Sequence, residues 1–268
     1  MTDVTTQTGV DAIAAMFARA RSESRAAFLP YFPIGYPTYS ESLDTVEAMA
    51  GEGVDGFEIG MPFSDPLADG PAIQTATQIA LENGTTARRC LDAVGELRAR
   101  GIRQPMLMMG YLNPILAYGV DKFVRDARAV GADGLIIPDM PPEESADMAS
   151  VCAREGMALV FFLAPTSNDR RIDLVAEKAT GFIYVVSFTG ITGARDALAA
   201  ELTSFIARVR AKALGIPLVL GFGINTPEQA RSMNGFVDGF IVGTALVKAG
   251  REGIEAVRAL ARSLRTAL

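Results

Sequence analysis

The sequence predicts an α/β protein, a (β/α)8 TIM barrel with an extra N-terminal helix. The first observation is that short apolar runs alternate with helical patterns, which implies parallel strands joined by right-handed crossovers. The second is that eight such units fit within a chain of 268 residues. The third is that the apolar runs are continuous, as in strands covered on both faces. An open doubly wound sheet is the alternative that this pattern leaves.

The elements follow one another at regular intervals. The first nine residues are polar and are expected to be disordered. An amphipathic pattern then predicts a helix over Asp11–Ser24. The expected strands are Ala27–Tyr31, Gly56–Gly60, Met106–Gly110, Gly134–Pro138, Ala158–Leu163, Phe182–Val186, Leu218–Gly221 and Gly239–Gly243. The expected helices are Ser40–Gly51, Ala87–Arg100, Val120–Val130, Glu143–Glu155, Arg170–Ala179, Leu202–Ala213, Pro227–Asn234 and Gly253–Ala267. We find no linker, so residues 1–268 are expected to form one domain.

Composition narrows the class of protein. Apolar residues make up 49% of the chain and charged residues 21%, which is typical of a folded domain rather than a disordered chain. The net charge of −6 argues against nucleic acid as a partner. No apolar run approaches the length that spans a bilayer. Cys90 and Cys152 show neither metal-site nor disulfide spacing, so we expect a reducing, cytoplasmic setting.

The chain contains no histidine. Histidine-based acid–base catalysis and histidine-bearing metal sites are therefore excluded, and no metal site is expected. Proton transfer must then fall to Asp, Glu, Tyr, Lys or Cys. None of the four lysines sits at the carboxyl end of a predicted strand, so a Schiff-base lysine in the site is not expected either; they are Lys122, Lys178, Lys212 and Lys248.

Two connections are longer than a barrel requires, and both follow the carboxyl ends of strands. They are Met61–Gln74 and Ser187–Ala199. Loops of this length in a compact domain are usually lids or binding loops. Because both leave the same end of parallel strands, they are expected to border the same face, where barrel enzymes place their active sites.

Glycines at the last strand ends predict a phosphate site. Gly221 and Gly223 follow the seventh strand, Gly243 ends the eighth, and Gly193 in the long sixth loop is placed to complete the site. Barrels commonly bind phosphate with the loops after strands seven and eight, where backbone N–H groups approach the anion. The alternative is that each glycine only makes a tight turn.

Three acidic residues mark the candidate chemistry. Glu58 ends the second strand between Phe57 and Ile59, and burial there should raise the pKa of its carboxyl group, which suits an acid–base catalyst. The alternative for Glu58 is a structural ion pair. Asp65 and Asp69 lie in the following loop, where an Asx turn is the common role. Spacing alone does not choose between them.

The stretch over residues 57–71, FEIGMPFSDPLADGP, resembles the signature of the tryptophan synthase alpha subunit family. The resemblance extends over about residues 27–248 and implies a TIM barrel that cleaves indole-3-glycerol phosphate to indole and glyceraldehyde-3-phosphate. It implies that Glu58 and Asp69 are the catalytic pair. It assigns Asp65 and Pro66 to a loop that touches a partner subunit.

Further residues take their roles from the same resemblance. Tyr31 is expected to line the indole pocket, Tyr111 to be a pocket or gating residue, and Tyr184 to lie near the substrate. Thr192, beside Gly193, is expected to bond the catalytic aspartate when the sixth loop closes. For the aromatic residues, simple packing is the alternative.

Loop residues are assigned in the same way. Asn113 is expected to contact the partner, and Asp139 to support the site from behind. Thr244 stands where the family usually has serine, but its hydroxyl and N–H groups still suit a phosphate. Pro33 stands where a small or polar residue is usual.

The resemblance also implies the partner. It predicts an assembly of the alpha2beta2 type with a beta subunit that carries pyridoxal phosphate, while this chain binds no cofactor itself. Three alternatives remain: a stand-alone indole-forming lyase, another phosphate-binding barrel enzyme, and a non-catalytic activator of the beta subunit.

Overall fold

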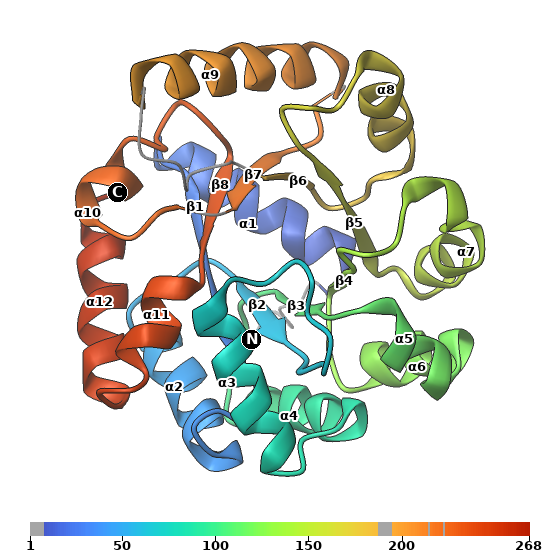
Figure 1. Cartoon of the computed structure of the whole chain (residues 1–268), viewed down its shortest axis with the longest axis vertical. Helices are drawn as coiled ribbons and strands as arrows, with labels where there is room; N and C mark the ends of the chain where they lie inside the picture. The colour runs from blue at the N-terminus through green and yellow to red at the C-terminus, as the bar shows by residue number, and fades with distance from the viewer. Residues whose placement is uncertain (1–7, 187–194, 214, 222) are drawn as a thin grey trace, which may run out of the picture.

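The computed structural model describes residues 8–186, 195–213, 215–221 and 223–268, and it is a closed barrel of eight parallel strands in chain order (Figure 1). Each strand pairs with its sequence neighbours, and β1 closes the barrel against β8. The predicted fold class is confirmed. The strands are β1 (Ala27–Pro33), β2 (Phe57–Gly60), β3 (Met106–Met109), β4 (Gly134–Ile136), β5 (Ala158–Leu163), β6 (Ile183–Val186), β7 (Leu218–Gly221) and β8 (Gly239–Val242).

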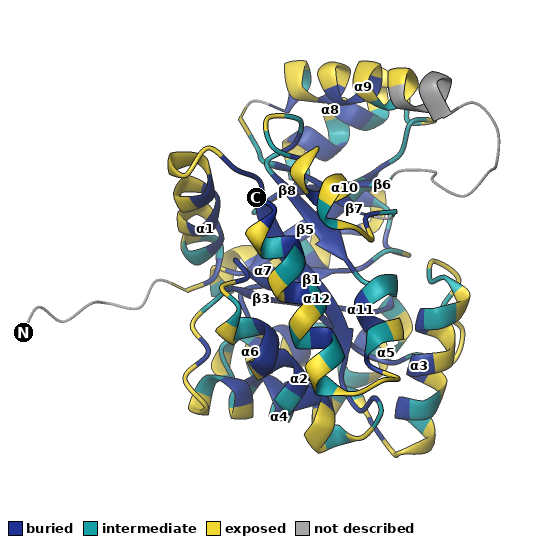
Figure 2. Cartoon of the chain, turned by 90° about the vertical axis from the view of Figure 1, so that its left-hand side faces the viewer, coloured by how far each residue is buried: buried dark blue, intermediate teal, exposed yellow. Residues whose placement is uncertain are grey.

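The helices surround this barrel, with buried faces toward the strands and exposed faces outward (Figure 2). The helices are α1 (Val10–Ser22), α2 (Tyr39–Gly51), α3 (Pro71–Glu82), α4 (Ala87–Ala99), α5 (Leu112–Tyr118), α6 (Val120–Ala129), the 3-10 turn η1 (Pro142–Glu144), α7 (Ala146–Glu155), α8 (Asp169–Lys178), α9 (Arg195–Lys212), α10 (Pro227–Arg231), α11 (Thr244–Ala249) and α12 (Ile254–Thr266). In the described parts of the chain we find no helix suited by length and apolarity to cross a membrane.

The extra N-terminal helix covers the amino-terminal end of the barrel. Helix α1 buries Ile13, Met16, Phe17 and Ala20. It lies at the end of the molecule opposite α3 and α11 (Figure 2). The start of α1 is anchored to the barrel, because the N–H of its N-cap residue Gly9 donates to Asp133 Oδ1 over 2.6 Å. Helix α1 therefore closes one mouth of the barrel and leaves the other to the loops that follow the strands.

Four polar residues join the strands in pairs at the amino-terminal end. Asp55, Asp133, Thr180 and Asp238 each stand one to three residues before an even-numbered strand and accept the backbone N–H of the strand before it, at 2.9, 2.9, 2.8 and 3.0 Å. Each returns its own N–H to a backbone carbonyl of the same strand. Because buried backbone groups must find partners, these reciprocal clamps divide the barrel into four strand pairs.

Three helices lie where the sequence pattern does not predict one. Helix α3 begins at Pro71, so the loop after β2 ends at Gly70 rather than at Gln74. Proline is suited to the first position of a helix, but a proline after glycine is equally typical of a loop. Helices α5 and α11 have seven and six residues, too few to show a helical period. Helix α9 begins at Arg195, before the expected start at Leu202. The expected disorder covers residues 1–9; residues 1–7 lie outside those described, while Gly9 is buried and bonded to Asp133.

Candidate active site

A cavity opens at the carboxyl-terminal end of the barrel. Seven of the residues that the sequence singled out line it: Tyr31, Glu58, Asp69, Tyr184, Gly223, Gly243 and Thr244. Five others complete the wall: Ile73, Met109, Ile224, Asn225 and Ile241. The cavity thus joins the ends of β1, β2, β3, β6 and β8 to the loops after β2 and β7. Strand order in a closed barrel brings these distant segments to one place.

Glu58 lies within β2, in register with Tyr31 of β1 and Leu107 of β3. It is 3% exposed. Burial raises the pKa of its carboxyl group to about 8, with a smaller contribution in the same direction from the charge of Asp69. Among the described residues no cation pairs with Glu58, so the ion-pair alternative finds no partner there. A carboxyl group of this kind is protonated at neutral pH and can donate that proton into the cavity.

Asp69 lies in the loop after β2, and Tyr111 holds it. Burial raises the pKa of Asp69 to about 6, against the opposing effect of a hydrogen bond from Tyr111. The Tyr111 hydroxyl donates to Asp69 Oδ2 over 3.1 Å and accepts the Ala68 N–H over 2.9 Å. Its ring stacks on Phe63 at 5.1 Å. Asp69 is therefore ionised at neutral pH and fixed in place, beside a protonated Glu58.

Asp65 has a different environment. It is exposed, does not line the cavity, and accepts a hydrogen bond from the Ser64 hydroxyl over 2.5 Å. The two loop acids that spacing left equivalent are thus distinguished by position, since only Asp69 reaches the cavity.

Two tyrosines fill space that glycines leave open. A Cβ added to Gly60 would overlap the Tyr31 side chain, and one added to Gly221 would overlap the Tyr184 ring. Both tyrosines are buried, and burial raises the pKa of each hydroxyl well above its usual value. Tyr184 also stacks on Phe162 at 4.6 Å. Gly221 itself is not among the residues that line the cavity. Its close packing against Tyr184 explains why a residue without a side chain is needed at this position.

The candidate phosphate site is formed by the segments that follow β7 and β8. Gly223 has φ of +88°, a conformation that favours glycine. Gly243 and Thr244 open helix α11, whose first N–H groups have no partner within the helix. The Asn225 side-chain amide donates to the Gly223 carbonyl over 3.0 Å. The predicted loop residues Thr192 and Gly193 lie outside the described residues.

Gln229 fixes the loop after β7. Its side-chain oxygen accepts the N–H of Asn225 at 2.7 Å and that of Thr226 at 3.1 Å. The Thr226 hydroxyl in return accepts the Gln229 N–H, which completes a capping box at the start of α10. The sequence Thr-Pro-Glu-Gln carries this signal, although the signal marks a helix start and does not by itself point to Asn225.

The remaining cavity residues were missed because they carry no chemical signal. Ile73, Met109, Ile224 and Ile241 are apolar, and only their place in the fold, in the first turn of α3, in β3, in the loop after β7 and in β8, sets them apart from core residues. They supply the apolar part of the cavity wall. In the described parts of the chain, no group of His, Cys, Asp and Glu is arranged to hold a metal ion.

The loops around the cavity present the expected partner residues. Asp65 and Asn113 are exposed, and Pro66 is half-buried. Leu67, next in the chain, is 94% exposed, which is unusual for a large apolar side chain. Asp139 supports this rim from behind, because its carboxylate accepts the Leu112 N–H at the start of α5 over 2.9 Å.

Comparisons with known proteins agree with this geometry. The family model described as tryptophan synthase alpha chain matches residues 17–267. The tryptophan synthase alpha chain of Roseiflexus sp. (strain RS-1) is 47% identical over 235 residues, which are 88% of this chain and 90% of that protein. Tryptophan synthase of Saccharomyces cerevisiae is 40% identical over 86% of this chain and 33% of that protein.

Solved structures give the same picture. A chain from a crystal structure of tryptophan synthase of M. tuberculosis superposes with a TM-score of 0.88 at 35% identity, covering 96% of this chain and 98% of that one. The tryptophan synthase subunit alpha of Legionella pneumophila superposes with a TM-score of 0.87 at 33% identity, covering 96% and 97%.

Proposed function

The chain belongs to the tryptophan synthase alpha chain family, and we propose that Glu58 and Asp69 are the two groups that carry out its reaction. That reaction is the retro-aldol cleavage of indole-3-glycerol phosphate to indole and glyceraldehyde-3-phosphate in the biosynthesis of L-tryptophan. The observation that supports our assignment is one cavity that holds two carboxyl groups with unlike pKa values, Glu58 at about 8 and Asp69 at about 6.

Glu58 acts first as an acid in this proposal. Its proton passes to C3 of the indole ring, which makes the ring an electron sink. The bond between C3 and the hydroxyl-bearing glycerol carbon then breaks, and its electrons return to the ring. The Glu58 carboxylate takes the proton of that hydroxyl as the aldehyde forms, so Glu58 ends the cycle protonated, as it began.

Asp69 acts as a fixed negative charge. Its carboxylate accepts the indole N–H and stabilises the positive charge that develops on the protonated ring. The hydrogen bond from Tyr111 orients that carboxylate before substrate binds. Ile73, Met109 and Ile241 provide the apolar wall for the ring, and the loops at Gly223 and Gly243 receive the phosphate.

The partner of this chain is a beta subunit, and the family's pyridoxal phosphate is carried by the beta chain. We propose that this chain holds no cofactor of its own. We assign Asp65, Pro66 and Asn113 to the contact with the beta subunit, together with the exposed Leu67 beside them. We also assign the chain to the cytoplasm, which the free, buried thiols of Cys90 and Cys152 support.

The alternatives have less support. A non-catalytic activator has no use for a buried, unpaired carboxyl group, because such a group costs stability without a function. No feature of the described residues favours another phosphate-binding barrel enzyme or a stand-alone lyase.

Indole release from indole-3-glycerol phosphate tests the assignment. The wild-type chain with its beta subunit should cleave the substrate. Glu58→Gln and Asp69→Asn should each lower kcat by at least about a hundredfold, a typical contribution for such groups. Asp65→Asn is the matched control. Because Asp65 is assigned to the contact with the beta subunit, this variant is assayed with that subunit in saturating excess, where it should keep near-normal kcat. Near-normal cleavage by Asp69→Asn, with loss of cleavage in Asp65→Asn, would show that Asp65 and not Asp69 is the catalytic acid of this loop.

A further inference from the structure

A second cleft lies at the amino-terminal mouth of the barrel, at the end opposite the active site. Its volume is about 990 Å³, and it is bordered by α1, by the segments that precede β2 and β3, and by the end of α12. Four arginines and two acidic residues line it: Arg19, Arg25, Arg103, Arg265, Glu23 and Asp55. The lining therefore carries a surplus of positive charge, although the whole chain has a net charge of −6.

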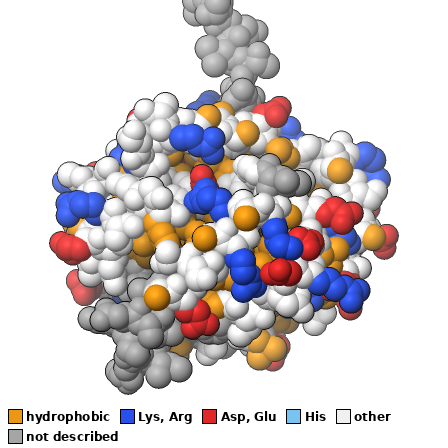
Figure 3. All heavy atoms as spheres, turned by 90° about the horizontal axis from the view of Figure 1, so that it is seen from above, with side chains coloured by type: hydrophobic (Ala, Val, Ile, Leu, Met, Phe, Trp, Pro, Cys, Tyr) orange, Lys and Arg blue, Asp and Glu red, His pale blue; other side chains and the backbone are white. Residues whose placement is uncertain are grey.

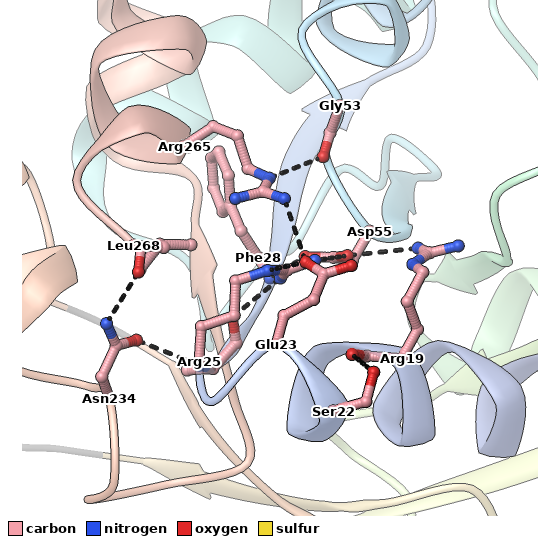
Figure 4. Close-up of polar contacts among 11 residues, drawn as sticks. Arg19, Ser22, Glu23, Arg25, Phe28, Gly53, Asp55, Asn234, Arg265 and Leu268 are labelled. Carbon is pink, nitrogen blue, oxygen red and sulfur yellow. Dashed lines mark hydrogen bonds and ion pairs between the residues drawn. The ribbon is translucent and has the colours of Figure 1, made fainter.

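The floor of this arginine cleft is rigid. The Arg25 guanidinium, whose side chain is 4% exposed, donates to both carboxylate oxygens of Asp55 at 2.6 and 2.8 Å (Figure 4). Asp55 also accepts the Phe28 N–H of β1. The Arg265 Nε donates to the Gly53 carbonyl over 2.9 Å. These contacts satisfy the buried charges and hold the surrounding side chains in fixed positions.

Two arginines on the walls keep most of their donors unused. Among the described residues, Arg19 has one side-chain partner, Asp55 Oδ1 at 3.1 Å, and its side chain is 53% exposed. Arg103 is exposed, and its one side-chain hydrogen bond in the same part of the structure is a long one of 3.4 Å to the Arg98 carbonyl. A guanidinium carries five N–H donors, so both side chains can bind a ligand without giving up an internal contact.

Arg103 also repels a neighbouring arginine, Arg98, which does not itself line the cleft. Burial lowers the pKa of Arg98, and the like charges of Arg103 and Arg128 lower it further. Arg98 has Asp133 as its partner at 2.6 Å, whereas Arg103 has no acidic partner among the described residues. An anion placed beside Arg103 would relieve this repulsion.

We propose that the arginine cleft is a binding site for a small polyanion that carries two phosphate groups. The planar fork of a guanidinium matches phosphate oxygens in pairs, and Arg19 and Arg103 offer two such forks to one space. The volume falls within the range of small-molecule sites. The cleft is separate from the active site, because the two share no lining residue.

Backbone amide NMR with sodium pyrophosphate as the probe tests this site directly. Titration should shift the amide signals of Gly53 and Gly101, which line the cleft, and the shift should saturate. The amides of Gly223 and Gly243 report phosphate bound at the active site in the same spectra. Sodium chloride of equal ionic strength is the salt control. No shift at Gly53 and Gly101, or the same shift with chloride, would overturn the proposal.

Variants identify the groups that bind. Arg19→Gln combined with Arg103→Gln should lower the affinity for pyrophosphate, as reported by the amide signals of Gly53 and Gly101, by at least about tenfold. This is the loss expected when charge-assisted hydrogen bonds are removed. The titration at Gly223 and Gly243 should be unchanged, which shows that the variant is folded. Arg125→Gln removes an exposed charge on α6 outside the cleft and should change neither. Equal affinity at Gly53 in the double variant and the wild type would contradict the assignment.

Discussion

Glu58 and Asp69 are chemically alike, yet their surroundings give them different protonation states. Burial acts on both, but Tyr111 donates a hydrogen bond to Asp69 alone. The first carboxyl group to ionise also discourages ionisation of the second, because the two charges face one cavity. A proton donor and a fixed negative charge, which this cleavage needs, thus arise from two carboxyl groups.

The kcat for indole release should have a bell-shaped dependence on pH. Activity requires an ionised Asp69, so it should fall as the pH drops through about 6, where Asp69 takes up a proton. It also requires a protonated Glu58, so it should fall as the pH rises through about 8. Steady-state kcat for indole release, followed from about pH 5 to about pH 9, measures both limbs, which belong to the coupled pair. A rate that stays level over this range would show that these groups do not control the chemistry.

Tyr111→Phe tests how Asp69 is positioned. The substitution removes a donor that lowers the pKa of Asp69, so the acidic limb of the profile should move to higher pH. At a pH of about 6, kcat should fall about tenfold, roughly the effect of one hydrogen bond to a charged group. Tyr118→Phe is the control, since that hydroxyl bonds Asp126 on α6, away from the cavity. A lower rate with an unmoved acidic limb would indicate a packing defect instead.

At the scale of elements, the eight strands can be located from the sequence to within a few residues, because a short, continuous apolar run flanked by turn residues is typical of a buried strand. The start of helix α3 cannot be located in this way, because the helix begins at Pro71 directly after Gly70, and a glycine followed by a proline is equally typical of a loop. Asp65 and Asp69 are not distinguished by spacing, because the fold of the loop decides which side chain reaches the cavity. Gly221 is predicted to contact phosphate, while packing against Tyr184 also requires a glycine there.

Gln229 of helix α10 holds the loop after β7, which we propose binds the substrate phosphate. Gln229→Ala removes the acceptor for the N–H groups of Asn225 and Thr226. The loop would then sample other conformations, and KM for indole-3-glycerol phosphate should rise about tenfold while kcat changes little. Steady-state kinetics separate the two constants. Gln78→Ala, at an exposed contact with Glu82, is the control. A fall in kcat at unchanged KM would place Gln229 outside phosphate binding.

At the scale of the molecule, charge is arranged in local pairs. The face drawn in Figure 3 carries basic and acidic side chains interspersed with one another. Between α8 and α9, for example, Lys212 pairs with Asp173 at 2.7 Å. Exposed pairs of this kind contribute little to stability individually. The buried clamp at Asp55 is different, because its charge has almost no access to water.

Asp55→Asn should therefore destabilise the whole fold. Burial alone would raise the pKa of Asp55, but hydrogen bonds from Arg25 and the Phe28 N–H outweigh it and lower the pKa. The asparagine would leave the buried Arg25 with Glu23, at 2.6 Å, as its one carboxylate partner among the described residues, at a cost of about 3 kcal/mol in the free energy of unfolding. Urea unfolding at neutral pH measures this loss, which should shrink as the pH falls and Asp55 itself becomes protonated.

Asp92→Asn is the matched control for that experiment. Asp92 forms an exposed pair with Arg88 on α4, so its loss should change the free energy of unfolding by less than about 0.5 kcal/mol. If both variants lost the same amount, the clamp would have no special role in stability.

The four clamps also bear on how the chain is made. Their partners are 27, 27, 21 and 20 residues apart, so each strand pair can close soon after its own stretch leaves the ribosome. Closure of the barrel differs, because Ala27 of the first strand must wait for Gly239 of the eighth. Until then the edge of β1 has no neighbour and is open to strands of other chains. The growing chain is thus exposed to pairing with other chains at the edge of β1 that faces β8, and that exposure lasts until β8 has been made and paired.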